Sequence, residues 1–232
     1  MIEIVRPEAT YYLPKGFSQD KIDDFVANGR GTEPELHPAL QEILERSPGD
    51  VITAGVFVGG LLPTLCKYAT RVWAWDCVPE HVKCAHKMTK ANKLRNVTIQ
   101  LAALGDCVET VQVTTGCTGQ PSLLGASCIV ENGECVSDLL DLKEFDLDVF
   151  DVQQTTIDSN SYTDLQLIQL DLEGYELPAL VGAKRTIEQH KPVIIVEDRR
   201  ALCHDLLYSM GYTFQGTRAG DRIYIHRSKV DK

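Results

Sequence analysis

The chain has 232 residues, enough for one sizeable α/β domain with a hydrophobic core. It carries 33 acidic residues against 23 lysines and arginines, a net charge of −10, which disfavours a surface that tracks nucleic-acid phosphates. The N-terminus lacks the basic flank followed by an apolar core that marks a signal peptide. No apolar run approaches the ~20 residues that a membrane span needs. We therefore expect a cytoplasmic protein that binds neither nucleic acid nor membrane.

The eight cysteines include no C-x-x-C pair. In a chain that can bury an ample core, this is typical of reduced thiols. Cys117, Cys128 and Cys135 lie close together in the sequence, but their spacings match no standard zinc framework. We expect them to be small, half-buried core residues, and we expect no metal site.

In chain order, residues 1–49 are predicted to form an N-terminal helical and extended segment that packs on the core, with the main domain at residues 50–232. Ser18 can cap a helix over Asp20–Ala27. A second helix is indicated near Pro38–Arg46, where apolar residues recur on one side.

From Asp50 the sequence becomes apolar and predicts a strand followed by a glycine-rich turn, VITAGVFVGG. Gly55 permits a tight turn at the strand end, and Gly59 would let the backbone approach a ligand closely. The N–H groups at the start of the next helix, near Gly60, point the same way. The pattern favours a ligand-binding loop, although it also occurs in ordinary turns between a strand and a helix.

A second strand, Val72–Trp75, ends in Asp76, 21 residues after Gly55. A carboxylate at this place can accept hydrogen bonds from both hydroxyls of a ribose. The loop and this carboxylate together favour an adenosine-containing ligand. His81 and His86 follow on a helix, but their spacing puts them off a common face, so we expect two surface histidines.

A third strand is predicted at Asn96–Ala102, and the small residues after it, Ala103-Leu104-Gly105-Asp106, suit a flat ring lying against backbone. Another short strand is expected at Glu109–Thr114, followed by a loop rich in Gly, Ser and Thr through Ser127. The acidic run at residues 138–151 is expected to be solvated surface.

The most informative stretch runs from Leu165 to Asp198. Two apolar runs of strand length, Leu165–Leu172 and Pro192–Val196, flank a helical pattern that begins near Tyr175, which predicts a βαβ unit. Ligands of an open parallel sheet lie at the carboxyl ends of its strands. Carboxylates follow both strands and are expected to converge at that edge: Asp171, Glu173, Glu197 and Asp198.

Near the C-terminus, two strand-like pieces, Tyr212–Gln215 and Arg222–His226, are joined by six residues that include Gly216 and Gly220, a hairpin signature. A terminal antiparallel hairpin is not the usual end of a dinucleotide dehydrogenase sheet. It is the usual end of a class I methyltransferase sheet.

With these motifs in view, the chain resembles the FkbM-type S-adenosylmethionine-dependent methyltransferases over residues 50–226. The most specific likeness is IQLDLEGYELPALVGA, which is similar to the family's strand-end motif of Asp, an apolar residue, Glu-Gly, any residue and Glu. VITAGVFVGG stands at the family's first cofactor loop, VWAWDCVPE at its acidic second strand and NVTIQLAALGD at its third. The resemblance implies a Rossmann-like α/β fold of the class I methyltransferases, with a mostly parallel central sheet, helices on both faces and a C-terminal antiparallel hairpin.

The resemblance implies S-adenosylmethionine as the cofactor. Thr53 stands where the family generally has an acidic residue, and Phe57 where Asn is frequent. Thr53 can donate or accept a hydrogen bond but supplies no charge. The residues implied for cofactor binding are Thr53, Ala54, Gly55, Val56, Phe57, Gly59, Asp76, Cys77, Ala103, Leu104 and Asp171.

The implied chemistry is displacement at a sulfonium methyl by an acceptor oxygen, which needs in-line positioning within ~3–3.5 Å and removal of the hydroxyl proton. Asp171 is the first candidate for orienting the acceptor or the cofactor amine, Glu173 is the first candidate for the base, and Glu197 is the second. Structural alternatives are that Glu173 caps the following helix and that Glu197 pairs with Arg199 or Arg200. Because the family methylates hydroxyls of polyketides and glycans, the implied acceptor is a hydroxyl on a sugar or secondary metabolite.

Two other functions share part of this pattern. A nicotinamide-linked oxidoreductase would share the glycine turn and Asp76. Its fingerprint, however, is G-x-G-x-x-G, and residues Gly55–Gly59 do not match that motif. A non-catalytic adenosine-binding module is suggested by Thr53 and Phe57. Binding to S-adenosylmethionine, S-adenosylhomocysteine and NAD would separate the three hypotheses.

Overall fold

The computed structural model describes residues 1–16, 19, 22–23, 34–115, 127–132, 134–136 and 149–230. Most of the helix predicted over Asp20–Ala27 falls outside the described residues, as does Cys117; Ile22 and Asp23 are helical. No helix in these ranges is long and apolar enough to cross a membrane.

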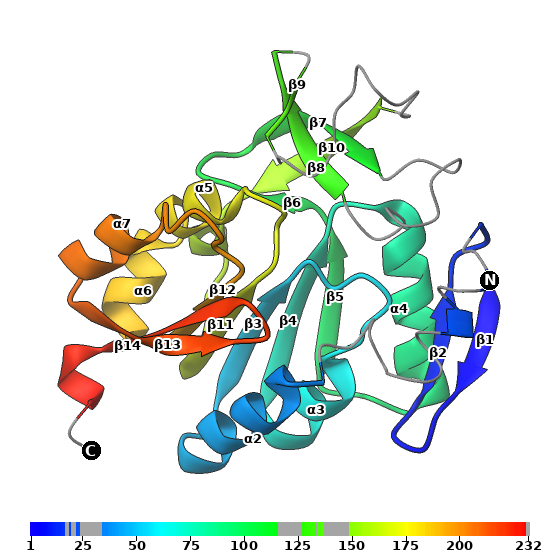
Figure 1. The fold of residues 1–232 in the computed structure, drawn as a ribbon, viewed down its shortest axis with the longest axis horizontal. Coiled ribbons are helices and arrows are strands. Elements are labelled where there is room, and N and C mark those ends of the chain that lie inside the picture. The colour runs from blue at the N-terminus through cyan, green and yellow to red at the C-terminus, as the bar shows by residue number, and fades with distance from the viewer. Residues whose placement is uncertain are drawn as a thin grey trace.

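The central sheet has seven strands within the described residues: β3 (Asp50–Ala54), β4 (Arg71–Asp76), β5 (Val97–Leu101), β11 (Leu165–Leu170), β12 (Val193–Val196), β13 (Tyr212–Arg218) and β14 (Asp221–His226). Their spatial order is β13-β14-β12-β11-β3-β4-β5 (Figure 1). The five strands from β12 to β5 pair in parallel, whereas β14 and β13 are antiparallel. This confirms the predicted sheet with its terminal hairpin.

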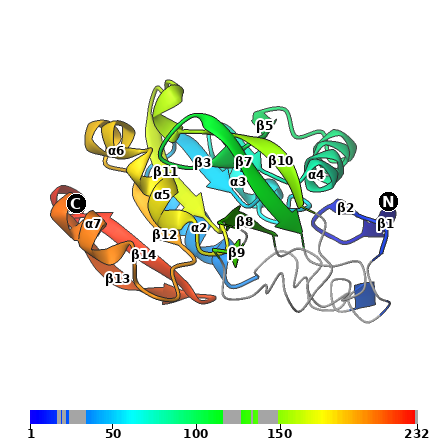
Figure 2. The same cartoon turned by 90° about the horizontal axis from the view of Figure 1, so that it is seen from above.

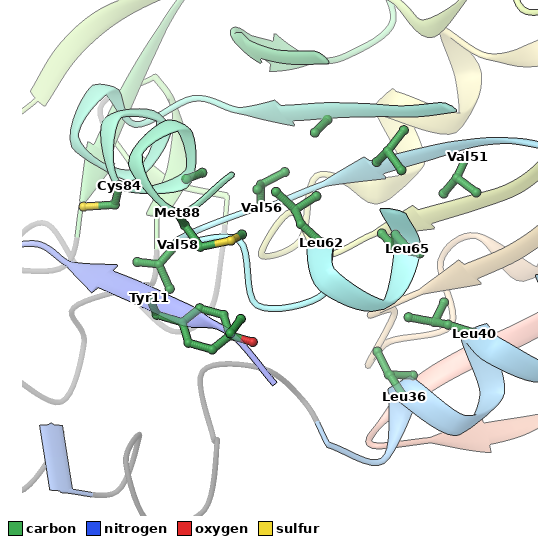
Figure 3. Close-up of a cluster of buried hydrophobic side chains, with 14 of the residues drawn as sticks. Tyr11, Leu36, Leu40, Val51, Val56, Val58, Leu62, Leu65, Cys84 and Met88 are labelled. Atoms are coloured by element: carbon green, nitrogen blue, oxygen red, sulfur yellow. The ribbon is translucent and has the colours of Figure 1, made fainter. Parts of the chain in front are cut away.

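Helices cover both faces of this sheet. One face carries α2 (Leu36–Arg46), α3 (Leu62–Tyr68) and α4 (Pro79–Ala91), and the other carries α5 (Glu176–Val181), α6 (Lys184–His190) and α7 (His204–Ser209). Since successive strand residues point to opposite faces, Val51 packs in the first core and Ile52 in the second. Figure 3 shows part of the first core, where side chains from α2, α3 and α4 gather with Tyr11.

The N-terminal segment packs on the helices of the first face. β1 (Ile2–Val5) and β2 (Thr10–Leu13) form an antiparallel pair, and β2 lies against α4. At the end of α4, the side chain of Asn92 accepts the backbone N–H of Thr10 at 2.8 Å and donates to the Thr10 carbonyl at 2.7 Å. The Asn92 side chain therefore takes the place of a neighbouring strand for the N–H and carbonyl of Thr10.

The predicted single helix of the βαβ unit is divided into α5 and α6 by Gly182 and Ala183. A Cβ at Gly182 would collide with the carbonyl oxygen of Gly105. The glycine lets this turn pack directly on the backbone that follows β5, and the helix is interrupted where that contact is made.

A second sheet was not predicted. Within the described residues it contains β6 (Ala103–Leu104), β7 (Glu109–Thr115), β8 (Ser127–Glu131), β9 (Glu134–Cys135) and β10 (Val149–Thr155), in the order β6-β10-β7-β8-β9. β7 matches the strand expected at Glu109–Thr114. Residues 138–148 of the acidic run lie outside the described residues; at its end Asp151 is exposed, as expected, although β10 already begins at Val149.

This second sheet lies over the carboxyl ends of the central strands (Figures 1 and 2). Ala103, Val113, Ile129, Val152 and Tyr175 form a small core that joins the two sheets. The sequence pattern placed a ligand at this edge, and the structure adds a cover to it.

Candidate active site

Three predicted carboxylates meet at the carboxyl ends of β11 and β12. Carboxylate oxygens of Asp171, Glu173 and Glu197 lie within 4.8 Å of one another, and each residue is half-buried. Asp198, the fourth acid expected there, is buried, and its oxygens accept two backbone N–H groups just before α7 at 2.8 and 2.9 Å. Asp198 therefore shapes the turn into α7.

Glu173 is left available for chemistry. It holds a left-handed backbone conformation with φ of 52°, which is rare for a residue other than glycine and is found at strained functional positions. Its carboxylate makes no hydrogen bond or ion pair with the described residues. The acid that holds the turn is Glu176, which accepts the N–H groups of Leu172 at 2.8 Å and Gly174 at 3.2 Å. The alternative in which Glu173 caps the helix was therefore wrong.

The electrostatics of the cluster suit a base. Burial, and next the carboxylate of Glu197, raise the pKa of Glu173 to about 7, while Arg199 acts in the opposite direction. Arg199 donates to one oxygen of Glu197 at 2.6 and 3.1 Å, which confirms the pairing considered for Glu197. A carboxyl group with a pKa near neutrality can both accept and release a proton at physiological pH.

A pocket opens beside this cluster, and we call it the carboxylate pocket. It lies between the turn into α5 and the segment before α7. Its lining residues are Glu173, Gly174, Glu176, Leu177, Glu197, Asp198, Arg199, Arg200, Leu202 and Cys203.

A second pocket lies where the central sheet meets the second sheet, and we call it the inter-sheet pocket. The ends of β3, β4 and β5 form one side of it and β8 forms the other. Most of the predicted cofactor residues line it. Its lining residues are Ala54, Gly55, Trp75, Asp76, Cys77, Ala102, Ala103, Leu104, Ser127, Cys128, Ile129, Asp171, Leu172 and Tyr175.

Three predicted cofactor positions, Thr53, Val56 and Gly59, instead face the protein interior. Thr53 is buried and donates to the Gln169 side chain at 2.5 Å. Val56 packs in the first core near Met88, as Figure 3 shows, and a Cβ on Gly59 would collide with the Met88 methyl group. Any contact of these residues with a cofactor would rest on their backbone groups.

Phe57 and Asp76 are joined in the same region. The N–H of Phe57 donates to one oxygen of Asp76 at 2.7 Å, and the N–H of Val78 donates to the other at 2.8 Å. His81 is buried, 3.3 Å from the Asp76 carboxylate and edge-on to the Phe57 ring, so the expectation of a surface position for His81 was wrong. His86 is exposed, as expected.

The residues of the inter-sheet pocket fit an adenosine ligand. Ala103, Leu104 and Cys77 offer an apolar surface for a flat base, and burial raises the pKa of the Cys77 thiol to about 12, which keeps it neutral. Asp76 supplies an anionic acceptor, and the buried indole N–H of Trp75 has no hydrogen-bond partner among the described residues.

Sequence reasoning missed Trp75 and the residues that β8 contributes. Ser127 lies in β8, and its hydroxyl is 3.7 Å from the Cys77 sulfur although the two are 50 positions apart. The apolar run SCIVE could have indicated a strand. Nothing local in it shows that the strand crosses over the ends of the central sheet.

Comparison with known proteins decides the family. The family model described as the methyltransferase FkbM domain matches residues 60–221, well over half of the chain. The chain belongs to the FkbM methyltransferase family. The part of this FkbM chain that matches begins at Gly60, so the Thr53–Gly59 loop precedes it. No curated protein matches the chain.

Among solved structures, the methyltransferase FkbM from Methylobacillus flagellatus KT is similar, with a TM-score of 0.51 and 19% identity over 76% of this chain and 43% of that protein. This FkbM chain thus spans less than half the length of that relative. A SAM-dependent methyltransferase from Aquifex aeolicus aligns with a TM-score of 0.47 and 13% identity over 90% of this chain and 97% of the other. The predicted class I methyltransferase fold is confirmed.

Proposed function

We propose that this chain is an S-adenosylmethionine-dependent O-methyltransferase whose cofactor binds in the inter-sheet pocket and whose acceptor enters the carboxylate pocket. One observation carries the proposal. Asp171 lines the inter-sheet pocket, Glu173 lines the carboxylate pocket, and their carboxylate oxygens lie within 4.8 Å of each other. The two pockets therefore meet at the acids that would orient and deprotonate an acceptor.

In this proposal Ala103, Leu104 and Cys77 contact the adenine base, and Asp76 contacts the ribose. Asp76 already accepts two backbone N–H groups, but each carboxylate oxygen has two lone pairs and can accept another donor. Asp171 is positioned to bind the amine of the methionine portion. When bound, S-adenosylmethionine supplies a methyl group on a sulfonium, and its neutral thioether product needs no proton.

The proton therefore has to be managed on the acceptor side, and Glu173 is the proposed base. When the acceptor oxygen takes the methyl group, whose bond to sulfur would break with the electron pair left on sulfur, the acceptor O–H bond would break and its proton would pass to a Glu173 oxygen. Glu173 then releases the proton to water through the mouth of the carboxylate pocket. Glu197, held by Arg199, keeps the site anionic and is the second candidate for the base.

A hydroxyl on a sugar or secondary metabolite is the proposed acceptor, as the family resemblance implied. The carboxylates and guanidinium groups of the carboxylate pocket supply acceptors and donors for hydroxyl groups, and Leu177 and Leu202 supply apolar contact. Four acidic side chains in its lining oppose an anionic acceptor such as a nucleic acid. The proposed partner is therefore an uncharged small molecule or glycan.

A transfer experiment tests this function. The protein is incubated with methyl-labelled S-adenosylmethionine and a panel of glycosides and hydroxylated polyketides, and NMR locates the methyl group in the product. We expect a methoxy group on one acceptor class, and Glu173→Gln protein should form it far more slowly. Label on nitrogen or carbon would contradict O-methylation. Tight cofactor binding with no transfer to any acceptor would favour the non-catalytic module. Thr53 also suggests that module, because its hydroxyl donates to Gln169.

A further inference from the structure

A row of cations runs along the exposed side of α4 and continues past its end. All five are exposed: Lys83, Lys87, Lys90, Lys93 and Arg95. The opposite side of α4 packs in the first core. Residues 81–105, which include all five, contain no Asp or Glu, although the whole chain has a net charge of −10. We call these five residues the α4 basic stripe.

The stripe places like charges side by side on the helix. Lys83 and Lys87 are four residues apart, and Lys87 and Lys90 are three apart, so each pair lies on neighbouring turns. Like charges at these spacings destabilise a helix. Glu80 pairs with Lys83 at 3.3 Å, and the Lys87 ammonium lies 4.1 Å from the centroid of the Tyr12 ring. One acid and one ring offset only part of this charge, so an anionic partner would relieve the repulsion.

An exposed apolar side chain adjoins the C-terminal end of the stripe. Val5 is 72% exposed and lies opposite Thr10 in the β1–β2 pair. The backbone of Thr10 is bonded to the side chain of Asn92, which directly follows α4 and precedes Lys93. Figures 1 and 2 both show the β1–β2 pair beside α4. Cations and an apolar side chain therefore share one surface.

This combination fits an anionic bilayer. Clusters of about four to eight lysines and arginines on a helix bind acidic phospholipids, and an apolar side chain beside them can enter the headgroup region. Protein interfaces are depleted in lysine, which makes up four of the five stripe residues. Single-stranded nucleic acids are bound by aromatic side chains that stack on bases, and none of the stripe residues is aromatic. The acidic remainder of the protein opposes binding only weakly, because charges more than ~8 Å apart are largely screened at physiological ionic strength.

We propose that the α4 basic stripe and Val5 bind the surface of a bilayer that contains anionic phospholipids. The binding is peripheral and reversible. The expectation of no membrane partner rested on the lack of apolar runs, which surface binding does not require. The proposal is independent of the proposed function, because the carboxylate pocket adjoins α5 and α7, which cover the opposite face of the central sheet. Protein bound through the stripe therefore keeps that pocket open to acceptors.

Vesicle sedimentation tests the proposal with the full chain. The protein is mixed with phosphatidylcholine vesicles that contain about 30% phosphatidylserine, and with vesicles of phosphatidylcholine alone, at about 0.1 M and about 1 M salt. We expect it to sediment with the anionic vesicles at the lower salt, to bind them at least about tenfold more weakly at the higher salt, and not to bind phosphatidylcholine alone. Equal binding to both kinds of vesicle, or binding to neither, would overturn the proposal. Binding of duplex DNA in place of anionic vesicles would assign the stripe to nucleic acid instead.

Charge-reversal variants locate the binding surface. Lys87→Glu/Lys90→Glu should weaken vesicle binding at least about tenfold, and Val5→Ser should weaken it about threefold. Lys184→Glu/Arg218→Glu is the matched control, because it makes the same change of net charge at exposed cations of α6 and β13. The control should bind vesicles within about twofold of the unmodified protein.

Melting temperatures verify that each variant folds, and S-adenosylhomocysteine affinity should be unchanged in all of them. Equal losses of vesicle binding in the two double variants would show that only the overall charge matters, and they would overturn the proposal. Vesicle binding that requires the stripe, in a protein that does not bind S-adenosylhomocysteine, would contradict the proposed function and support this proposal.

Discussion

The backbone N–H of Phe57 donates to the Asp76 carboxylate at 2.7 Å, which joins the turn after β3 to the end of β4. Phe57 has a left-handed conformation with φ of 52°, which suits Asn or Gly better than an aromatic residue. The hydrogen bond and the edge contact with His81 hold it there. Asp76 therefore shapes the turn after β3 in addition to its proposed contact with the ribose.

Asp76→Ala should consequently affect binding and stability together. Loss of the acceptor leaves two buried backbone N–H groups unpaired and removes the ribose contact, so S-adenosylhomocysteine affinity should fall at least tenfold and stability by ~1–3 kcal/mol. Calorimetry and thermal unfolding measure the two effects. Glu188→Gln, a change at an exposed acid of α6 that lines neither pocket, is the control and should alter neither. An Asp76→Ala protein with unchanged affinity would remove this residue from the cofactor site.

The two glycines of the loop should behave differently although both have positive φ, of 80° at Gly55 and 89° at Gly59. A Cβ at Gly55 would collide with the Asp171 carbonyl, whereas a Cβ at Gly59 would collide with Met88 in the first core. Gly55→Ala should displace Asp171 and impair cofactor binding. Gly59→Ala should mainly lower the melting temperature. Replacing Met88 by the shorter Val should recover part of that loss, and lack of any recovery would argue against the packing role.

This contrast shows why part of the site could not be predicted. The sequence marks Gly59 as a position that needs a glycine, but a glycine has the same signature whether its missing side chain would face a ligand or the core. The strand-end acids were predictable for the opposite reason. Glu173 and Glu197 follow apolar runs whose parallel pairing places their ends at one edge whatever the details of packing.

The second sheet escaped prediction because its pairing is not local. β10 pairs with β7 and β6, which lie far from it in the sequence. Its first residues continue an acidic run whose composition is typical of a solvated surface. β8 carries a clear apolar run, but its position over Cys77 depends on that distant pairing. Period and composition predict that strands exist, and they do not predict which sheet those strands join.

Turnover should depend on pH through Glu173. Because its pKa is raised to about 7, the base form is lost below that pH, and kcat/KM should fall about tenfold per pH unit on the acid side. Glu173→Gln should reduce turnover ~10²–10⁴-fold with cofactor affinity nearly unchanged. Arg199→Ala removes the cation that lowers the Glu173 pKa, so its acid limb should move to higher pH. A Glu173→Gln enzyme with full turnover would make Glu197 the residue to test.

The same group should lower stability as pH rises. A raised pKa in the folded state means that folded protein holds the Glu173 proton more tightly than unfolded protein. Stability from this group is therefore full below its ordinary value of 4.5 and is lost as pH rises to about 7. Glu173→Gln should match the unmodified protein near pH 4.5 and exceed it by ~1–3 kcal/mol at pH 8. Denaturant unfolding at the two pH values measures this, and a less stable Glu173→Gln protein at pH 8 would contradict the burial of an unpaired carboxyl.

Calorimetric titration with S-adenosylmethionine, S-adenosylhomocysteine and NAD tests the central claim most directly, because it decides the cofactor before any acceptor is known. Both sulfur-containing ligands should bind at one site per chain, NAD should not bind, and Asp76→Ala should weaken the binding of both sulfur-containing ligands. Binding of NAD, or no heat with either sulfur-containing ligand, would contradict it.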